Sequence, residues 1–163
     1  MKNSKFFLIL AAGILMSLSA NADESSKPKV VYQTVQTVHN VPGIEFEKPQ
    51  IFQVHKENQA TSSKMTIHNS SDKELVITQF KCQGFARTEL HNSRFINGER
   101  EMYEIKSITV PAHGKTVISP NRTHFMMFDP EREFKIGEYL TMELQTNLGT
   151  IPVIAEIVPR RLK

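Results

Sequence analysis

Residues 138–158 read EYLTMELQTNLGTIPVIAEIV, and this stretch indicates the fold class of the whole chain. In its first half, the apolar residues Leu140, Met142 and Leu144 alternate with polar ones. An apolar residue at every second position is typical of a strand with one buried face, because successive side chains of a strand point to opposite sides. The stretch therefore predicts two strands, Glu138–Thr146 and Thr150–Val158.

The rest of the chain shows the same pattern. Short runs rich in Val, Ile, Thr, Phe and Tyr recur about every 10–14 residues and are separated by Gly, Pro, Asn and Ser. No window holds an apolar period of 3.6 residues long enough for a helix. The fold class that follows is all-β, a single antiparallel β-sandwich or Greek-key barrel. The other predicted strands are Val30–Val38, Gln50–Val54, Lys64–His68, Glu74–Phe80, Arg87–Phe95, Glu99–Val110, Lys115–Ser119 and Thr123–Phe128.

The first 22 residues have the features of a secretory signal peptide. Lys2 and Lys5 precede the apolar run Phe6–Leu18, and Ala20-Asn21-Ala22 matches a cleavage site, so we expect cleavage after Ala22. The apolar run is too short to span a membrane, and the mature protein is expected to contain no span. We divide the chain into the signal peptide 1–22, an N-terminal extension with a first strand 23–43, a β domain 44–159 and a tail 160–163.

Charge and composition exclude several classes of protein. The chain has 20 Lys and Arg against 17 Asp and Glu, and removal of Lys2 and Lys5 with the signal peptide leaves 18 against 17, a net charge of +1. That balance, without a basic run, gives no basis for nucleic-acid binding. The composition also excludes a coiled coil, a disordered chain and an integral membrane protein. With one cysteine, Cys82, no disulfide can form within the chain, and we expect Cys82 to be buried.

No catalytic motif is present in the sequence. It holds no G-x-S-x-G, no C-x-x-C, no glycine-rich phosphate loop and no convincing Ser/His/Asp set. Histidine and methionine remain as the residues that could carry chemistry. After residue 22 the chain has six His and five Met.

Four of these residues lie on two predicted strand segments. An Asn97-Gly98 turn between extended runs predicts a two-residue hairpin that pairs Ser93 with Met102, which makes Met102 a diagonal neighbour of His91. Diagonal neighbours on one face are ~7–8 Å apart, within reach of two long side chains. His124 and Met126 are two residues apart on another strand and share a face. The pattern permits two His/Met pairs to converge, but it does not bring the two segments together.

The spacing of these four residues resembles a known motif. His91, ten residues, Met102, twenty-one residues, His124, one residue and Met126 is similar to the motif of the PCuAC family of periplasmic copper(I) chaperones. The segments Met65–Asn69 and Glu89–His91, the turn Val110–Gly114 and the run Pro120–Met126 also resemble the family. The resemblance extends over about residues 44–159.

The resemblance implies a cupredoxin-like fold and a function. His91, Met102, His124 and Met126 would be the ligands of one Cu(I) ion, since thioether sulfur and neutral imidazole suit a soft ion. The protein would be a monomeric periplasmic metallochaperone that delivers copper, with the CuA centre of cytochrome c oxidase as the destination. Because a carrier makes and breaks no bond of a substrate, it would not be an enzyme. Its transient partner would be oxidase subunit II or a thiol-containing copper chaperone.

Other interpretations stay open at this level. The protein could sequester copper for tolerance, act as an electron-transfer cupredoxin, or be a metal-free β-sandwich adhesion module. A blue copper site needs a Cys ligand near the last His, whereas Cys82 precedes all four candidates. The chain also departs from the family pattern at Asn121-Arg122, where the family has two glycines, and at His113, which we expect to be an exposed turn residue.

Overall fold

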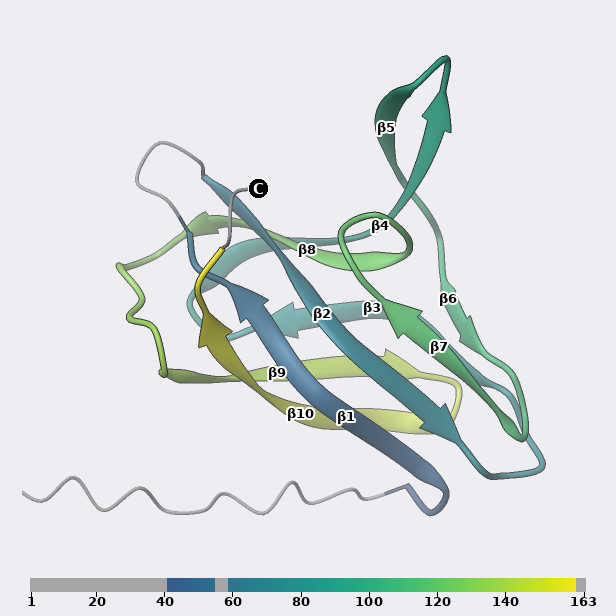
Figure 1. Ribbon diagram of the computed structural model, residues 1–163. Helices are drawn as coiled ribbons and strands as arrows, with labels where there is room; N and C mark the ends of the chain where they lie inside the picture. The colour runs from purple at the N-terminus through teal and green to yellow at the C-terminus, as the bar shows by residue number, and fades with distance from the viewer. Residues whose placement is uncertain (1–40, 55–58, 161–163) are drawn as a thin grey trace, which may run out of the picture. The chain divides into compact units, whose positions relative to one another are not determined.

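Ten strands and no helix make up the regular structure of residues 41–54 and 59–160, which the computed structural model describes (Figure 1). These residues therefore contain no helix long and apolar enough to cross a membrane. The predicted signal peptide, the predicted strand Val30–Val38 and residues 161–163 lie outside the described residues. The strands are β1 Ile44–Phe52, β2 Ala60–Asn69, β3 Leu75–Cys82, β4 Phe85–Ile96, β5 Glu99–Glu104, β6 Ile108–Val110, β7 Gly114–Ile118, β8 His124–Pro130, β9 Tyr139–Thr146 and β10 Gly149–Val158.

The all-β prediction is confirmed, and two predicted boundaries need correction. The strand predicted to begin at Gln50 begins at Ile44, as β1. The pairing of β1 with β2 shifts register between Glu47 and Gln50, where Lys48 adopts a φ of 47°. A β-bulge absorbs Lys48 and Pro49, whose turn-like chemistry suggested an interruption.

The second correction concerns the predicted strand Glu99–Val110, which is two strands, β5 and β6. They separate at Ile105, whose backbone N–H donates to the carbonyl of Leu90 at 2.8 Å. The first part then pairs with β4 and the second with β3. One extended run in the sequence thus forms two strands that pair with different neighbouring strands. Only long-range pairing determines where the run divides.

The strands form a mixed sheet that is not closed, in the order β5-β4-β8-β2-β1-β10-β9-β3-β6, with β7 also paired to β2. Neighbouring strands are antiparallel, except for β1 and β10, which run parallel with Gln50 opposite Glu156. β2 forms three ladders: one with β1, one with β7 and, through Ala60–Ser62, one with β8. β8 and β4 thereby join the rest of the fold through β2.

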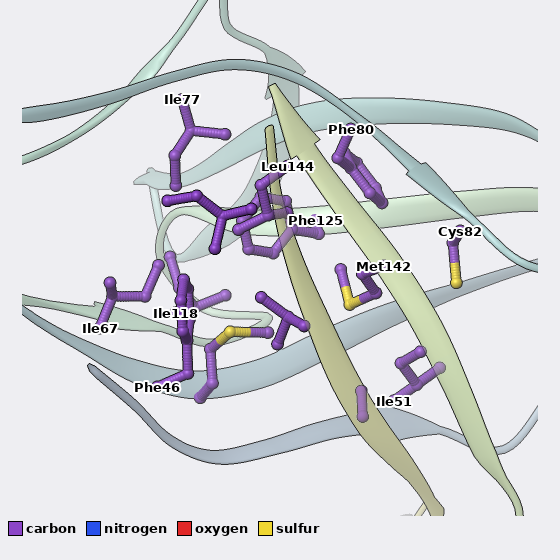
Figure 2. Close-up of a cluster of buried hydrophobic side chains, with 14 of the residues drawn as sticks. Phe46, Ile51, Ile67, Ile77, Phe80, Cys82, Ile118, Phe125, Met142 and Leu144 are labelled. Carbon is purple, nitrogen blue, oxygen red and sulfur yellow. The ribbon is translucent and has the colours of Figure 1, made fainter. Parts of the chain in front are cut away.

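The hydrophobic core contains side chains from strands on both sides of β2 in the strand order (Figure 2). Phe80 on β3 and Phe125 on β8 make an edge-to-face contact with ring centroids 4.9 Å apart. Met65, Met127 and Met142 are also buried in this core. Full burial of a side chain of this size contributes about 1.5–3 kcal/mol. Because Phe125 and Met127 occupy the core side of β8, His124 and Met126 are on its other side.

The hairpin of β4 and β5 has the register predicted from its turn. Asn97 and Gly98 adopt φ values of 52° and 85°, as a two-residue turn of this kind requires. Ile96 lies opposite Glu99, and Ser93 lies opposite Met102. Figure 1 shows the hairpin tip extending beyond the other strands. Phe95, Ile96 and Met102 on it are exposed.

Candidate metal centre

His91 and His124 face each other across β4 and β8. The two residues form a cross-strand pair, and their ring centroids are 5.9 Å apart (Figure 1 shows the two strands side by side). The pairing joins positions 33 residues apart in the chain, which the sequence pattern could not predict. The structure therefore brings the two His/Met segments together.

Each of these rings has one nitrogen bonded and one free. His91 Nε2 lies 2.7 Å from Glu89 Oε2, and His124 Nδ1 lies 2.7 Å from the carbonyl oxygen of Arg122. The remaining nitrogens, His91 Nδ1 and His124 Nε2, are buried without a hydrogen-bond partner. Within residues 41–54 and 59–160 they are the two buried side-chain nitrogen or oxygen atoms that lack one. Such an atom costs about 1–3 kcal/mol while it has no partner, and a metal ion bound by both nitrogens would remove that cost.

His124 is held in its neutral form. Burial lowers the pKa of its imidazole below the ordinary 6.5, and the nearby charges of His91 and Arg100 act in the same direction. The hydrogen bond to the Arg122 carbonyl opposes them without reversing the shift. A neutral imidazole keeps the lone pair that a metal ion needs.

The lowered pKa predicts a pH-dependent stability for the copper-free protein. Unfolded His124 takes up a proton near pH 6.5, whereas the folded residue resists until its lower pKa is reached. The free energy of unfolding should therefore fall by up to about 1.4 kcal/mol per pH unit as the pH decreases from 6.5 to that pKa. Urea unfolding at several pH values measures it. A His124→Leu variant should lose this contribution, and equal pH dependence in both proteins would contradict it.

The two methionines occupy different environments. Met126 is buried, lies two residues from His124 on the same side of β8, and is opposite Glu89 of β4. Met102 lies on the β5 edge, opposite Ser93, and its side chain is 46% exposed. Ser93 Oγ donates to the carbonyl of Pro120 at 2.8 Å, so the hairpin is attached to the loop that precedes His124. His124 and Met126 are thus buried and His91 is half-buried, whereas Met102 lies on the same face of the sheet and is exposed.

The loop before His124 explains how the chain manages without the glycine pair. Neither Asn121 nor Arg122 adopts a positive φ, so side chains are compatible with this turn. Arg122 N–H donates to the carbonyl of Ser119 at 2.9 Å, and the Asn121 side chain accepts from Arg100 of β5 at 2.8 Å. Asn121 therefore attaches the loop to the hairpin that carries Met102, while Arg122 closes the turn within the loop.

Glu89 and Arg87 surround His91 and were not predicted as site residues. Glu89 accepts from His91 through one oxygen and from Arg87 through the other. Burial acts to raise the pKa of Glu89, but hydrogen bonds and charge from His91 and Arg87 outweigh it and lower the pKa. The i, i+2 spacing of Arg87, Glu89 and His91 on one strand face was the signal that could have revealed them.

The remaining candidates lie elsewhere. Cys82 is buried opposite Met142 of β9, and burial raises the pKa of its thiol to about 12, which makes it inert. His113 is an exposed turn residue with a φ of 52°, as expected, and contacts Asp72. In the described part of the chain, no three His, Cys, Asp or Glu residues cluster as a metal site. A metal at His91 and His124 would thus need the neutral thioethers, a donor set suited to a soft ion.

Comparisons with known proteins define the class of this fold. An apo PCuAC domain from PmoF1 has a TM-score of 0.65 and 18% identity, covering 75% of this chain and 98% of that domain. A copper-bound PCuAC domain from PmoF2 gives 0.62 and 17%, covering 74% and 96%. The CuI-DR1885 solution structure from Deinococcus radiodurans gives 0.59 and 20%, covering 72% and 79%. The chain has the cupredoxin-like fold of PCuAC domains, as the motif predicted.

The family of the chain is shown by a match between its sequence and a family model. The model of the LpqE-like family, described as a lipoprotein family, matches residues 44–157, and the chain belongs to this family. No curated protein sequence matches the chain.

Proposed function

We propose that the protein is a periplasmic Cu(I) metallochaperone that binds one ion through His91, Met102, His124 and Met126. As a carrier it makes and breaks no covalent bond of a substrate. We further propose that it delivers the ion to the CuA centre of cytochrome c oxidase. The copper-bound PCuAC domain of PmoF2 and CuI-DR1885 support copper as the cargo of this fold.

One observation carries the proposal. His91 Nδ1 and His124 Nε2 are buried without partners in two rings that contact each other across β4 and β8. Both nitrogens are on rings whose other nitrogen is already hydrogen-bonded, as is usual for metal-binding histidines. A metal-free adhesion module would have no reason to keep two such atoms in its interior.

The methionine ligands favour Cu(I) over Cu(II), and they allow the ion to be released to an acceptor. Thioether and imidazole ligands are neutral, so the site offers no anionic ligand to compensate the higher charge of Cu(II). Met102 is the exposed ligand, and an acceptor with thiolate ligands can approach from its side. A soft thiolate donor binds Cu(I) more strongly than a thioether, which gives the transfer its direction.

Replacement of both methionines tests the proposal. The double variant Met102→Leu/Met126→Leu keeps side-chain volume but removes both sulfur donors, and its Cu(I) affinity should fall about tenfold or more. Anaerobic titration against a competing Cu(I) chelator measures the change. Copper transfer from the loaded wild-type protein to a soluble CuA domain, followed by the CuA absorption, tests the destination.

Met127→Leu is the matched control, because Met127 is adjacent in sequence, fully buried and part of the core. It should retain wild-type affinity. Equal affinity in the double variant and the wild type would refute thioether ligation. Tight Cu(I) binding without transfer to the CuA domain would leave the carrier intact and reject this destination.

A further inference from the structure

The contact between Glu89 and His91 determines which nitrogen of His91 is available. The distance from Glu89 Oε2 to His91 Nε2 is 2.7 Å. A carboxylate only accepts hydrogen bonds, so the neutral ring must carry its proton on Nε2 and its lone pair on Nδ1. His91 Nδ1 is the buried nitrogen that has no partner.

We propose that Glu89 is a positioning residue that fixes His91 in the Nε2–H tautomer, so that copper binds the ring through Nδ1. The copper step rests on the proposed function; the effect on the ring does not. His124 is held in the opposite sense, because its Nδ1 bonds to the Arg122 carbonyl and leaves Nε2 free. The two histidines would then present different nitrogens to one ion.

Arg87 keeps Glu89 in place for this role. Its guanidinium bonds to Oε1 of Glu89, which leaves Oε2 for His91. The Arg87 Nε also lies 3.5 Å from Asp129 Oδ2. The same guanidinium stacks 3.9 Å from the ring centre of Phe128, and that ring lies 6.1 Å from the His91 ring. Arg87 is therefore held from two sides, and each Glu89 oxygen has a single defined partner.

Burial separates this contact from an ordinary surface ion pair. The side chains of His91 and Glu89 are 14% and 23% exposed, whereas those of the similar pair His68 and Glu47 are 38% and 51% exposed. Exposed pairs contribute little because water competes for both groups. The more shielded Glu89 carboxylate can hold one ring orientation, and second-sphere partners of this kind typically change metal affinity by about 10–100-fold.

The test uses the copper-free protein first. Long-range ¹H–¹⁵N NMR spectra at a pH of about 8, where histidine is neutral, report the tautomer of each ring. The wild type should show His91 with its proton on Nε2. Glu89→Gln has one acceptor oxygen, which Arg87 can take, and its amide NH2 can then only donate to His91 Nε2, so this variant should favour the proton on Nδ1. Glu89→Ala should yield a mixture of both tautomers.

Cu(I) affinity provides the second readout. Glu89→Ala and Glu89→Gln should both bind Cu(I) about 10–100-fold more weakly, because neither variant fixes the ring with its lone pair on Nδ1. Glu47→Ala is the matched control, since it removes the same kind of contact from His68 and should change neither the His91 tautomer nor the affinity. Thermal unfolding of each variant verifies that it is folded.

A wild-type His91 protonated on Nδ1, or a Glu89→Ala protein with unchanged tautomer and affinity, would overturn the inference. A Glu89→Gln protein that lost affinity while His91 kept its proton on Nε2 would also overturn it, because charge rather than ring orientation would then be responsible. A wild-type protein without Cu(I) affinity would reject the proposed function and the copper step. The apo spectra would still decide whether Glu89 fixes the ring.

Discussion

Replacing His124 with leucine should lower Cu(I) affinity at least about 100-fold while leaving the copper-free protein as stable as before, or about 1 kcal/mol more stable. The loss of affinity follows because the buried Nε2 is a proposed ligand, and removing a ligand should cost no less than losing a second-sphere partner. The gain in stability follows because an unsatisfied buried nitrogen costs about 1–3 kcal/mol, which exceeds the loss of the hydrogen bond to Arg122 at about 0.5–1.5 kcal/mol.

Two measurements separate these effects. Competition with a chelator under anaerobic conditions gives the affinity, and urea unfolding of the apo protein gives the stability. His68→Leu is the control, because His68 is a half-exposed histidine on β2 and is not a proposed ligand. This variant should bind Cu(I) as tightly as the wild type. If His124→Leu bound Cu(I) within about threefold of wild type, His124 would not be a ligand.

Loading with Cu(I) should stabilise the protein by about 4 kcal/mol when the free ion is buffered near 1,000 times the dissociation constant. The proposed ligands lie on β4, β5 and β8 and come together only when these strands pair, so an unfolded chain binds the ion far less well. For a domain of this size the gain corresponds to a rise in melting temperature of roughly 10–25 °C.

Anaerobic calorimetry with and without buffered Cu(I) measures this shift, and excess chelator should reverse it. The double variant Met102→Leu/Met126→Leu should show a smaller rise at the same free Cu(I), since its occupancy is lower. A melting temperature that does not respond to Cu(I) would mean that the ion does not bind the folded state preferentially.

Local chemistry explains which parts of the fold could be predicted. The Asn97-Gly98 turn determines the register of β4 and β5 within a few residues, and the pairing of Ser93 with Met102 is as predicted. The predicted start of β1 at Gln50 is wrong because Lys48 and Pro49 resemble turn residues, whereas the strand begins at Ile44. Pairing on both sides, with β2 and with β10, keeps β1 extended through that bulge, and no local signal reports such neighbours.

The candidate site, like the fold, could be predicted from the sequence only in part. The shared face of His124 and Met126 follows from the period of a strand. The contact between His91 and His124 depends on the pairing of β4 with β8, which the spacing alone does not contain. The burial of His124 and the exposure of Met102 likewise depend on packing. Glu89 lies two residues before His91 in the sequence, but only the structure shows that it contacts Nε2 of the His91 ring.

The parallel pairing of β1 with β10 has a consequence for how the chain folds. It joins the first and last strands of the described domain, so one central ladder of the sheet cannot form until the C-terminal strand is available. Folds dominated by such distant pairings have a high contact order and fold on the millisecond-to-second timescale. The β4–β5 hairpin closes through a two-residue turn and can form in microseconds. The hairpin that carries Met102 can therefore form early, whereas the β1–β10 ladder waits for the end of the chain.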